Sequence, residues 1–295
     1  MKIGVILRAA EVDGDGRTPP WSEVRAFALA AEDRGFDSVW MWDHFFHRTE
    51  DGSVEGMHEP WTILSAIAAV TDRVELGTLV MCTSFRSPGL LAKMAATLDE
   101  VSGGRLILGI GAGWFDPEYE AFGFPVDRRV ARFEESLRIV RSLLDGETLT
   151  FAGNFHRLEG AVLAPVPTRR IPVLVAGDGP RMLRLTARHA DAWNVAWYGH
   201  PDDGLRAMFA TFDEVLEAEG RDPGAVARTV GVTIRDPDAP VLEDEELAFR
   251  GSVAEMAALF DAYADLGADH LILEIVPKTE ASLDRVADAM RDRRG

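Results

Sequence analysis

The chain is poor in the residues that mark secreted and membrane-spanning proteins. Its 295 residues include one cysteine, Cys82, which cannot form a disulfide within the chain and fits a reducing compartment. No run of 18 or more apolar residues is present, and the first apolar stretch, 3–7, ends at Arg8, too soon for a signal-peptide core. The sequence therefore predicts a cytoplasmic protein without a membrane span.

Positive charge is also scarce. The chain has 31 Lys and Arg against 49 Asp and Glu, a formal net charge of −18, and its basic residues are scattered rather than clustered. Such a surface repels phosphate backbones and anionic lipid heads. We therefore expect no nucleic-acid partner and no membrane partner, and a small molecule as the substrate.

Several catalytic motifs are missing. No glycine-rich dinucleotide fingerprint follows the first apolar run, and no nucleophile elbow surrounds Ser84. Cys82 has no evident activating base, which disfavours nucleophilic catalysis. The nearby histidines His44, His47 and His58 lack the companion ligands on the first strand that a metal-dependent barrel hydrolase uses. No metal site is expected.

Strand-like and helix-like patterns alternate along the whole chain. Eight apolar, β-branched runs alternate with segments of helical periodicity, at 3–7, 38–41, 74–80, 106–110, 172–176, 192–196, 230–234 and 271–275. This count and length are typical of a (β/α)8 TIM barrel, so we predict an α/β fold with one barrel domain over 1–295. A doubly wound open sheet is the competing architecture, and the missing dinucleotide fingerprint disfavours it.

The longer segments between elements locate the expected active site. Those at 43–59, 113–127 and 235–251 follow predicted strands, and such loops converge at the C-terminal face of a barrel. The last is acidic over 243–246 and is expected to be a mobile cover. A fourth excursion, 146–170, follows a helix. One helix is expected to turn a single apolar stripe to the core, made of Leu90, Leu91, Met94, Ala95, Leu98 and Val101, and another to begin at a capping box of Ser252 and Glu255.

The residues at the predicted strand ends suggest acid–base chemistry beside an anion. His44 ends the second strand and is the natural general acid or base, because histidine exchanges protons near neutral pH. Asp43 precedes it directly, so in extended chain the two side chains point apart. Gly177 and Gly179 lie between a strand and a helix, where backbone N–H groups suit a phosphate, although a plain tight turn remains an alternative.

The remaining glycines and arginines leave alternatives open. Gly109, Gly111 and Gly113 alternate along one strand, which suits either a flat ligand ring or close packing at the barrel rim. Arg181 follows the phosphate loop as a possible anion contact or a solvated side chain. With Arg86 and Arg184 it forms the expected basic opening, so affinity for an anionic cofactor should fall with ionic strength. These three arginines are the candidates expected to lie nearest the strand ends that would bind the cofactor.

Stretches spread over about residues 2–275 resemble the luciferase-like flavin and deazaflavin oxidoreductases. The matching stretches are 35–40 with Asp43 and His44, 58–61, 74–80, 87–88, 91–99, 102–105, 108–114, 132–135, 176–179 and 190–194. The amino-acid sequences of 92–99 and 111–114 resemble the deazaflavin-using branch of this family more than its light-emitting branch. One departure is Trp114, which stands where deazaflavin sugar-phosphate dehydrogenases carry a glutamate. The resemblance thus implies an apolar substrate rather than a sugar phosphate.

The resemblance implies coenzyme F420, or FMN as the alternative, bound at the C-terminal face, with a non-proline cis peptide at Leu79–Val80. The implied function is hydride transfer between F420 and a small, apolar organic substrate, with His44 as catalytic residue. The alternative functions are a reduced-FMN monooxygenase that uses dioxygen and a non-catalytic flavin-binding protein. A homodimer is the expected oligomeric state, because symmetric dimers are the commonest oligomers. The expected cofactor-binding residues are Asp43, Leu79, Val80, Cys82, Gly111, Ala112, Gly113, Ala176, Gly177, Asp178, Gly179 and Arg181.

Overall fold

The computed structural model describes residues 1–11, 16–49, 52–238 and 247–293. The loop 235–251 is expected to be a mobile cover, and its central part, 239–246 with the acidic stretch 243–246, lies outside the described residues. The following account concerns only the described part of the chain.

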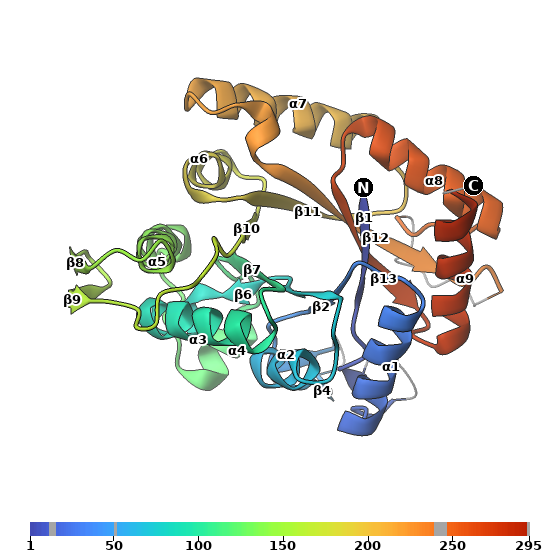
Figure 1. Cartoon of the computed structure of the whole chain (residues 1–295), viewed down its shortest axis with the longest axis horizontal. Helices are drawn as coiled ribbons and strands as arrows, with labels where there is room; N and C mark the ends of the chain where they lie inside the picture. Colours follow the sequence, from blue (N-terminus) through green and yellow to red (C-terminus); the bar gives the residue numbers. More distant parts are fainter. Residues whose placement is uncertain (12–15, 50–51, 239–246, 294–295) are drawn as a thin grey trace.

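Eight parallel strands close into a barrel, as the sequence predicted. The sheet runs in the order β10, β11, β12, β13, β1, β2, β5, β7, and a further pairing of β10 with β7 closes it. Figure 1 shows these strands enclosed by helices. The barrel strands are β1 (Lys2–Ile6), β2 (Ser38–Met41), β5 (Glu75–Thr78), β7 (Leu106–Gly111), β10 (Val173–Ala176), β11 (Ala192–Tyr198), β12 (Ala227–Arg235) and β13 (His270–Val276).

A helix follows each barrel strand and packs outside the sheet (Figure 1). The last but one, α8, begins at the capping box that the sequence predicted: the Ser252 N–H donates to the Glu255 carboxylate at 2.7 Å, and the Glu255 N–H donates to the Ser252 hydroxyl. The outer helices are α1 (Trp21–Asp33), α2 (Pro60–Ala68), α3 (Pro88–Val101), α5 (Arg129–Leu144), α6 (Pro180–His189), α7 (Asp203–Ala218), α8 (Val253–Leu266) and α9 (Glu280–Asp292).

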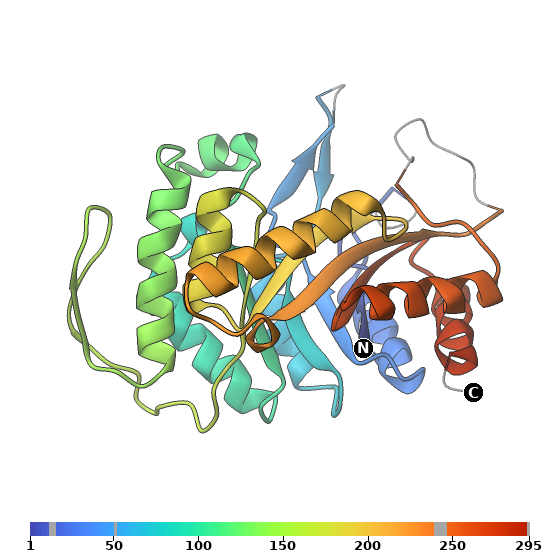
Figure 2. The ribbon, with the colours of Figure 1, turned by 90° about the horizontal axis from the view of Figure 1, so that it is seen from above.

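The predicted insertions form small elements of their own. After β2 comes a hairpin of β3 (Phe46–Arg48) and β4 (Val54–Gly56), and after β7 comes α4 (Asp116–Phe122). Both follow barrel strands, so they lie at the C-terminal face that carries the site. The excursion between α5 and β10 is a second hairpin, β8 (Leu149–Ala152) and β9 (Arg157–Ala161), which projects away from the barrel in Figure 2.

Aspartates in the short helix-to-strand loops tie neighbouring strands together. Asp37, just before β2, accepts a hydrogen bond from the Ile3 N–H of β1 at 2.7 Å. Asp191, before β11, accepts from the Val173 N–H of β10 at 2.9 Å. These bonds satisfy N–H groups at the start of each strand. The recurring Asp in these loops therefore has a structural reason at the N-terminal rim.

The barrel interior is filled around Trp40. A Cβ on Gly4 of β1 or Gly77 of β5 would overlap the Trp40 indole, so these glycines make room for it. The indole N–H donates to the Ser38 hydroxyl at 2.6 Å, and this hydroxyl lies 2.8 Å from His270 Nε2. Burial lowers the pKa of His270 to about 3, so the buried imidazole is neutral.

The third predicted strand, 74–80, is not continuous. β5 stops at Thr78, the Leu79–Val80 peptide is cis as the resemblance implied, and β6 (Met81–Cys82) resumes the pairing with β7. A Cβ on Gly109 would overlap the Thr78 carbonyl oxygen, and one on Gly111 would lie 2.7 Å from Val80 Cγ2. The glycines on β7 therefore give space to this bulge, which favours the close-packing interpretation of their alternation.

The predicted apolar stripe of α3 is partly wrong. Leu91 and Leu98 are buried against the barrel, but Leu90 is 55% and Val101 is 54% exposed. Leu91, Ala95 and Leu98 share one helical face, whereas Leu90 and Val101 lie on an adjacent face that points away from the sheet. The sequence prediction assigned residues of both helical faces to a single apolar stripe.

Candidate active site

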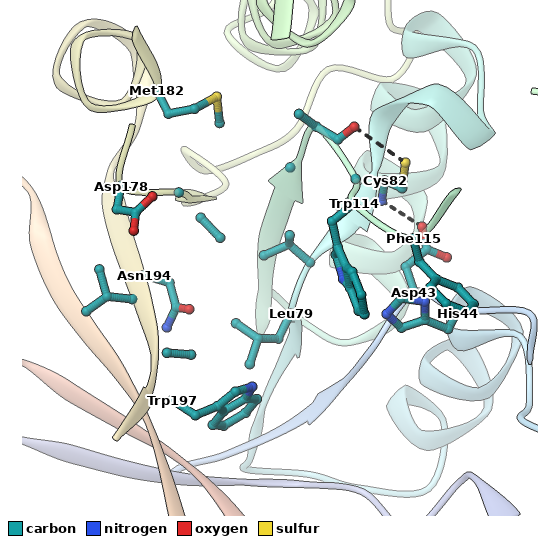
Figure 3. Close-up of a pocket in the computed structure, with 18 of the residues that line it drawn as sticks. Asp43, His44, Leu79, Cys82, Trp114, Phe115, Asp178, Met182, Asn194 and Trp197 are labelled. Carbon is teal, nitrogen blue, oxygen red and sulfur yellow. Dashed lines mark hydrogen bonds between the residues drawn. The ribbon is translucent and has the colours of Figure 1, made fainter. Parts of the chain in front are cut away.

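A cavity of about 630 Å³ opens at the C-terminal ends of β2, β5, β7, β10 and β11. Figure 3 shows Asn194, Asp178 and Met182 on one side, Trp114, His44 and Asp43 on the other, and Leu79 between them. Its volume lies within the range of small-molecule and cofactor sites. The predicted residues that line it are Asp43, His44, Leu79, Val80, Cys82, Gly111, Ala112, Gly113, Ala176, Gly177 and Asp178.

His44 lies at the cavity wall in a fixed orientation. Its Nδ1 lies 2.8 Å from Glu118 Oε2, and the Glu118 side chain is 1% exposed. Glu118 also accepts the backbone N–H groups of Phe45 and Phe46. Because Nδ1 is bonded to the carboxylate, Nε2 is the ring nitrogen left for a ligand. This arrangement suits a proton carrier.

Asp43 has other partners than His44 and belongs to a buried ion cluster. Its two oxygens accept a bidentate pair from Arg86 at 2.7 and 3.0 Å, and Oδ2 also accepts the Cys82 N–H at 2.7 Å. Arg86 further donates to Glu59, which caps α2. Burial raises the pKa of Asp43, and the Arg86 charge opposes that rise. The Arg86 guanidinium is therefore paired with two carboxylates, so it does not contribute to the predicted basic opening.

Cys82 lines the cavity as a neutral thiol. Burial raises its pKa to about 11, and its Sγ lies 3.0 Å from the Tyr119 hydroxyl. That hydroxyl donates to the Ala112 carbonyl at 2.8 Å. A thiol that holds its proton at neutral pH is a poor nucleophile, which agrees with the absence of an activating base in the sequence.

The predicted phosphate loop is only partly at the cavity. Gly177 lines it with a φ of 135°, a conformation that favours glycine, while the Asp178 side chain is exposed at the opening. Gly179 caps α6 and is not among the lining residues. Arg181 is half exposed and donates to Glu134 at 2.6 Å. The structure therefore does not bring Gly179 or Arg181 to the cavity wall.

Sequence reasoning missed several lining residues, among them the polar side chains of Asn194 and Glu118. Asn194 is 3% exposed on β11, and its amide nitrogen donates to the Thr229 hydroxyl at 2.8 Å, which orients the side chain. A polar residue within an otherwise apolar, buried strand is a signal that could have identified it. Glu118 offered no such signal, because it lies on a short helix whose position depends on the tertiary structure.

Positive charge is absent from the described wall of the cavity. The described residues that line the cavity include no Lys or Arg. They do include three carboxylates, those of Asp43, Glu118 and Asp178. Arg184, the last candidate for a basic opening, is exposed on α6 and is not a lining residue. Among the described residues, the structure therefore places none of the three arginines of the predicted basic opening on the cavity wall.

The three histidines near the rim have separate partners. His44 pairs with Glu118, His47 Nδ1 lies 3.2 Å from Glu55, and His58 Nε2 lies 2.7 Å from the Pro19 carbonyl. Within the described ranges, no group of three or more His, Cys, Asp or Glu side chains is placed to hold a metal ion. Nor does any described helix have the length and apolar character needed to cross a membrane.

A barrel with this site at its C-terminal face matches a known family. The family model of luciferase-like monooxygenases matches residues 1–273, so the chain belongs to the luciferase-like monooxygenase family. The family named from the sequence is confirmed. The chain is accordingly an oxidoreductase-type enzyme.

Two curated relatives are similar over most of the chain. An F420-dependent glucose-6-phosphate dehydrogenase of Kineococcus radiotolerans is 35% identical over 76% of this chain, and the match spans 66% of that protein, just under two thirds. A phthiodiolone/phenolphthiodiolone dimycocerosates ketoreductase of Mycobacterium tuberculosis is 33% identical over 92% of this chain and 79% of that protein.

Solved structures confirm the fold. An F420-dependent secondary alcohol dehydrogenase in complex with an F420–acetone adduct superposes with a TM-score of 0.83 at 22% identity, over 100% of this chain and 99% of that one. An EDTA monooxygenase of Chelativorans sp. superposes with a TM-score of 0.80 at 16% identity, over 99% and 94%. At these sequence identities, the structural similarity supports only a shared barrel fold.

Proposed function

We propose that the protein transfers a hydride between coenzyme F420 and an uncharged alcohol or ketone, with His44 as the proton carrier. The observation that carries this proposal is the oriented His44–Glu118 pair on the wall of the cavity. The names of the relatives support the cofactor, because a dehydrogenase and a structural neighbour are both described as F420-dependent.

The small-residue walls of the cavity fit a flat cofactor ring. Leu79 and Val80, from the bulge, line the cavity, and Figure 3 shows Leu79 between its two sides. The adjacent strand end contributes the small residues Gly111, Ala112 and Gly113. These residues would hold the ring, and the Gly177 turn would hold the phosphate through backbone N–H groups. Coenzyme F420, a 5-deazaflavin, supplies two-electron hydride chemistry when it is bound there. Cofactor contacts by Gly179 and Arg181 stay predictions.

The residues of the chain account for the proton. Oxidation of an alcohol would remove a hydride from its carbon and a proton from its hydroxyl, which leaves the carbonyl; bound F420 would be the hydride acceptor. His44 Nε2 accepts that proton, and the buried Glu118 carboxylate stabilises the resulting imidazolium. In ketone reduction the same nitrogen returns the proton to the carbonyl oxygen as the hydride reaches the carbon.

The charges around the cavity favour an uncharged substrate. A phosphorylated substrate would lie beside Asp178 and Glu118 without a described Lys or Arg on the wall to pair with it. Trp114, where sugar-phosphate dehydrogenases of this branch carry glutamate, adds apolar surface beside His44. A neutral alcohol or ketone leaves no charge unpaired.

Binding and turnover test the proposal directly. We expect the purified protein to bind F420 and to interconvert acetone and propan-2-ol with it, and His44→Ala to lower turnover by roughly 10² to 10⁴ while F420 affinity stays within several-fold. Tight FMN binding without F420 binding contradicts the proposal and favours the reduced-FMN monooxygenase. F420 binding without turnover of any alcohol or ketone favours a flavin-binding protein.

We also propose a homodimer that covers an apolar groove between α2 and α3. This groove, of about 310 Å³, is lined in part by Trp61, Met94 and Val101, and Leu90, one helical turn before Met94 on α3, is exposed. Leu90→Glu is expected to convert the dimer to a monomer in light scattering; a wild-type monomer contradicts the proposal. Cytoplasmic localisation and a single domain over 1–295 stay predictions.

A further inference from the structure

Aromatic rings run without interruption from His44 out to the surface. The His44 ring lies 5.7 Å from the Trp114 ring, which lies 5.3 Å from Phe115. Phe115 lies 6.2 Å from Phe46, and Phe46 lies 6.3 Å from Phe122, all measured between ring centroids. We call Trp114, Phe115, Phe46 and Phe122 the aromatic strip.

The strip is continuous with the cavity at one end and exposed at the other. Trp114 and Phe115 line the cavity, and Figure 3 shows them beside His44. Trp114 is nevertheless 66% exposed and Phe122 is 55% exposed, while Phe46 and Phe115 are partly buried. A large apolar surface held open at the mouth of a cavity marks a place where apolar ligand surface is bound.

The strip comes from two insertions rather than from the barrel. Phe46 lies on β3, whereas Trp114 and Phe115 follow β7 and Phe122 ends α4. Glu118, on the same helix α4, fixes His44 and accepts the Phe46 N–H, so one carboxylate places both the proton carrier and the strip. The contacts of Glu118 therefore hold the aromatic strip at a defined position relative to His44.

We propose that the substrate carries an extended apolar chain that lies along the aromatic strip while its hydroxyl or carbonyl carbon lies beside His44. This inference rests on the proposed function and makes the substrate a long-chain, lipid-like alcohol or ketone. None of the four strip side chains is charged, so the chain gains contact without meeting an unpaired charge. Phe122 is a specificity-determining residue that contacts the far part of the chain.

A series of methyl ketones tests the inference. With reduced F420 as hydride donor, we expect kcat/KM to rise from acetone to decan-2-one by up to about fourfold for each added methylene that reaches the strip. The rise should come mainly from a lower KM. Turnover of ketones with no dependence on chain length overturns the inference and leaves the proposed function standing, whereas no turnover of any ketone or alcohol contradicts the proposed function itself.

Paired variants locate the effect on the strip. Phe122→Gln is expected to reduce the ratio of kcat/KM for decan-2-one over acetone at least about tenfold. Val162→Gln, an equally exposed apolar position (53%) next to the β8–β9 hairpin, is the matched control and should keep the wild-type ratio. An unchanged ratio in Phe122→Gln, or conversion of a wild-type dimer to a monomer by that change, overturns the inference.

Fluorescence of the cofactor-free protein gives a readout that does not need turnover. Decan-2-one should change the tryptophan emission of the wild type in a saturable manner, and acetone at the same concentration should not. The change should be lost in Trp114→Phe, which keeps an aromatic ring but removes the reporting indole. Equal responses of wild type and Trp114→Phe overturn the placement of the chain on the strip.

Discussion

At the scale of single residues, the site depends on how Glu118 holds His44. The carboxylate is buried, lies 2.8 Å from Nδ1 and also accepts two backbone N–H groups. Removing its charge while keeping its shape should leave the ring in place but make proton acceptance less favourable.

We therefore expect Glu118→Gln to lower kcat for alcohol oxidation by roughly tenfold to a thousandfold, with KM and F420 affinity changed less than threefold. Steady-state kinetics and a cofactor titration on the same preparation measure this split. Glu120→Gln, at an exposed position on the same helix, is the control and should behave as wild type. A rise in KM with unchanged kcat would show that Glu118 serves substrate binding instead.

The two glycines of the phosphate loop should respond differently to substitution. Gly177 has a φ of 135°, and its Cβ would lie 3.2 Å from Met182, whereas a Cβ on Gly179 meets open space at an ordinary φ of −65°. We expect Gly177→Ala to weaken F420 binding at least about tenfold and Gly179→Ala to change it less than threefold. Isothermal titration measures both, and equal losses would contradict this assignment.

At the scale of elements, one arginine connects the ends of two helices to the barrel. Arg105 donates to the carbonyl oxygens of Ala68 at 2.9 Å and Thr71 at 2.7 Å after α2, to Val74 at 2.8 Å before β5, and to Ser102 at 2.6 Å after α3. A guanidinium has five N–H donors in a fixed plane, and an ammonium cannot reach the same set of carbonyls.

Arg105→Lys should therefore leave carbonyl groups without partners and lower the free energy of unfolding by about 2–3 kcal/mol. Urea denaturation followed by circular dichroism measures the change. Arg73→Lys is the matched control, because Arg73 makes one described side-chain bond, to the Glu32 carbonyl, and is exposed. A loss of less than about 0.5 kcal/mol in Arg105→Lys would show that water replaces these bonds at little cost.

At the scale of the whole molecule, the net charge of −18 sets how an anionic cofactor responds to salt. The described cavity wall has no Lys or Arg, and Asp178 lies at the opening, so long-range repulsion dominates the electrostatics. Salt screens that repulsion.

We thus expect F420 affinity to rise by roughly twofold to tenfold from low to high ionic strength, opposite to the expectation from a basic opening. Fluorescence titrations at several concentrations of sodium chloride measure the slope. Arg181→Ala should leave the slope unchanged, because the Arg181 guanidinium is paired with Glu134. A falling affinity would indicate cationic contacts on the bound cofactor.

Acid stability depends on the buried His270. Its pKa is about 3 in the folded protein and about 6.5 in an unfolded chain, so below pH 6.5 the unfolded state binds a proton that the native state does not. Unfolding free energy should fall by about 1.4 kcal/mol per pH unit from this group as pH drops below 6.5, and the group should have no effect above that.

His270→Gln removes the titrating group, so its stability should decline less steeply between about pH 6 and pH 4.5 than that of the wild type, whatever its absolute stability. Urea unfolding across this range compares the two slopes. His156 and His189 have pKa values lowered by burial and contribute with the same sign in both proteins. Identical slopes would show that His270 is protonated in the native state.

The sequence by itself determined the architecture and the place of the chemistry. Strand-like runs, helical periodicity and loop lengths are local properties, and they located all eight barrel strands and the C-terminal face to which His44, Gly111 and Gly177 belong. The resemblance located the cis Leu79–Val80 bond and the family, because both depend on short contiguous motifs.

Only the tertiary structure decided which side chains meet. Glu118 is 74 residues from His44, and Asp43 is 43 residues from Arg86, so no local pattern connects either pair. The same holds for Arg181, which the fold places against Glu134 rather than at the cavity. Periodicity reports which face of an element is buried, whereas the partner of a charged group depends on how distant insertions pack over the barrel mouth.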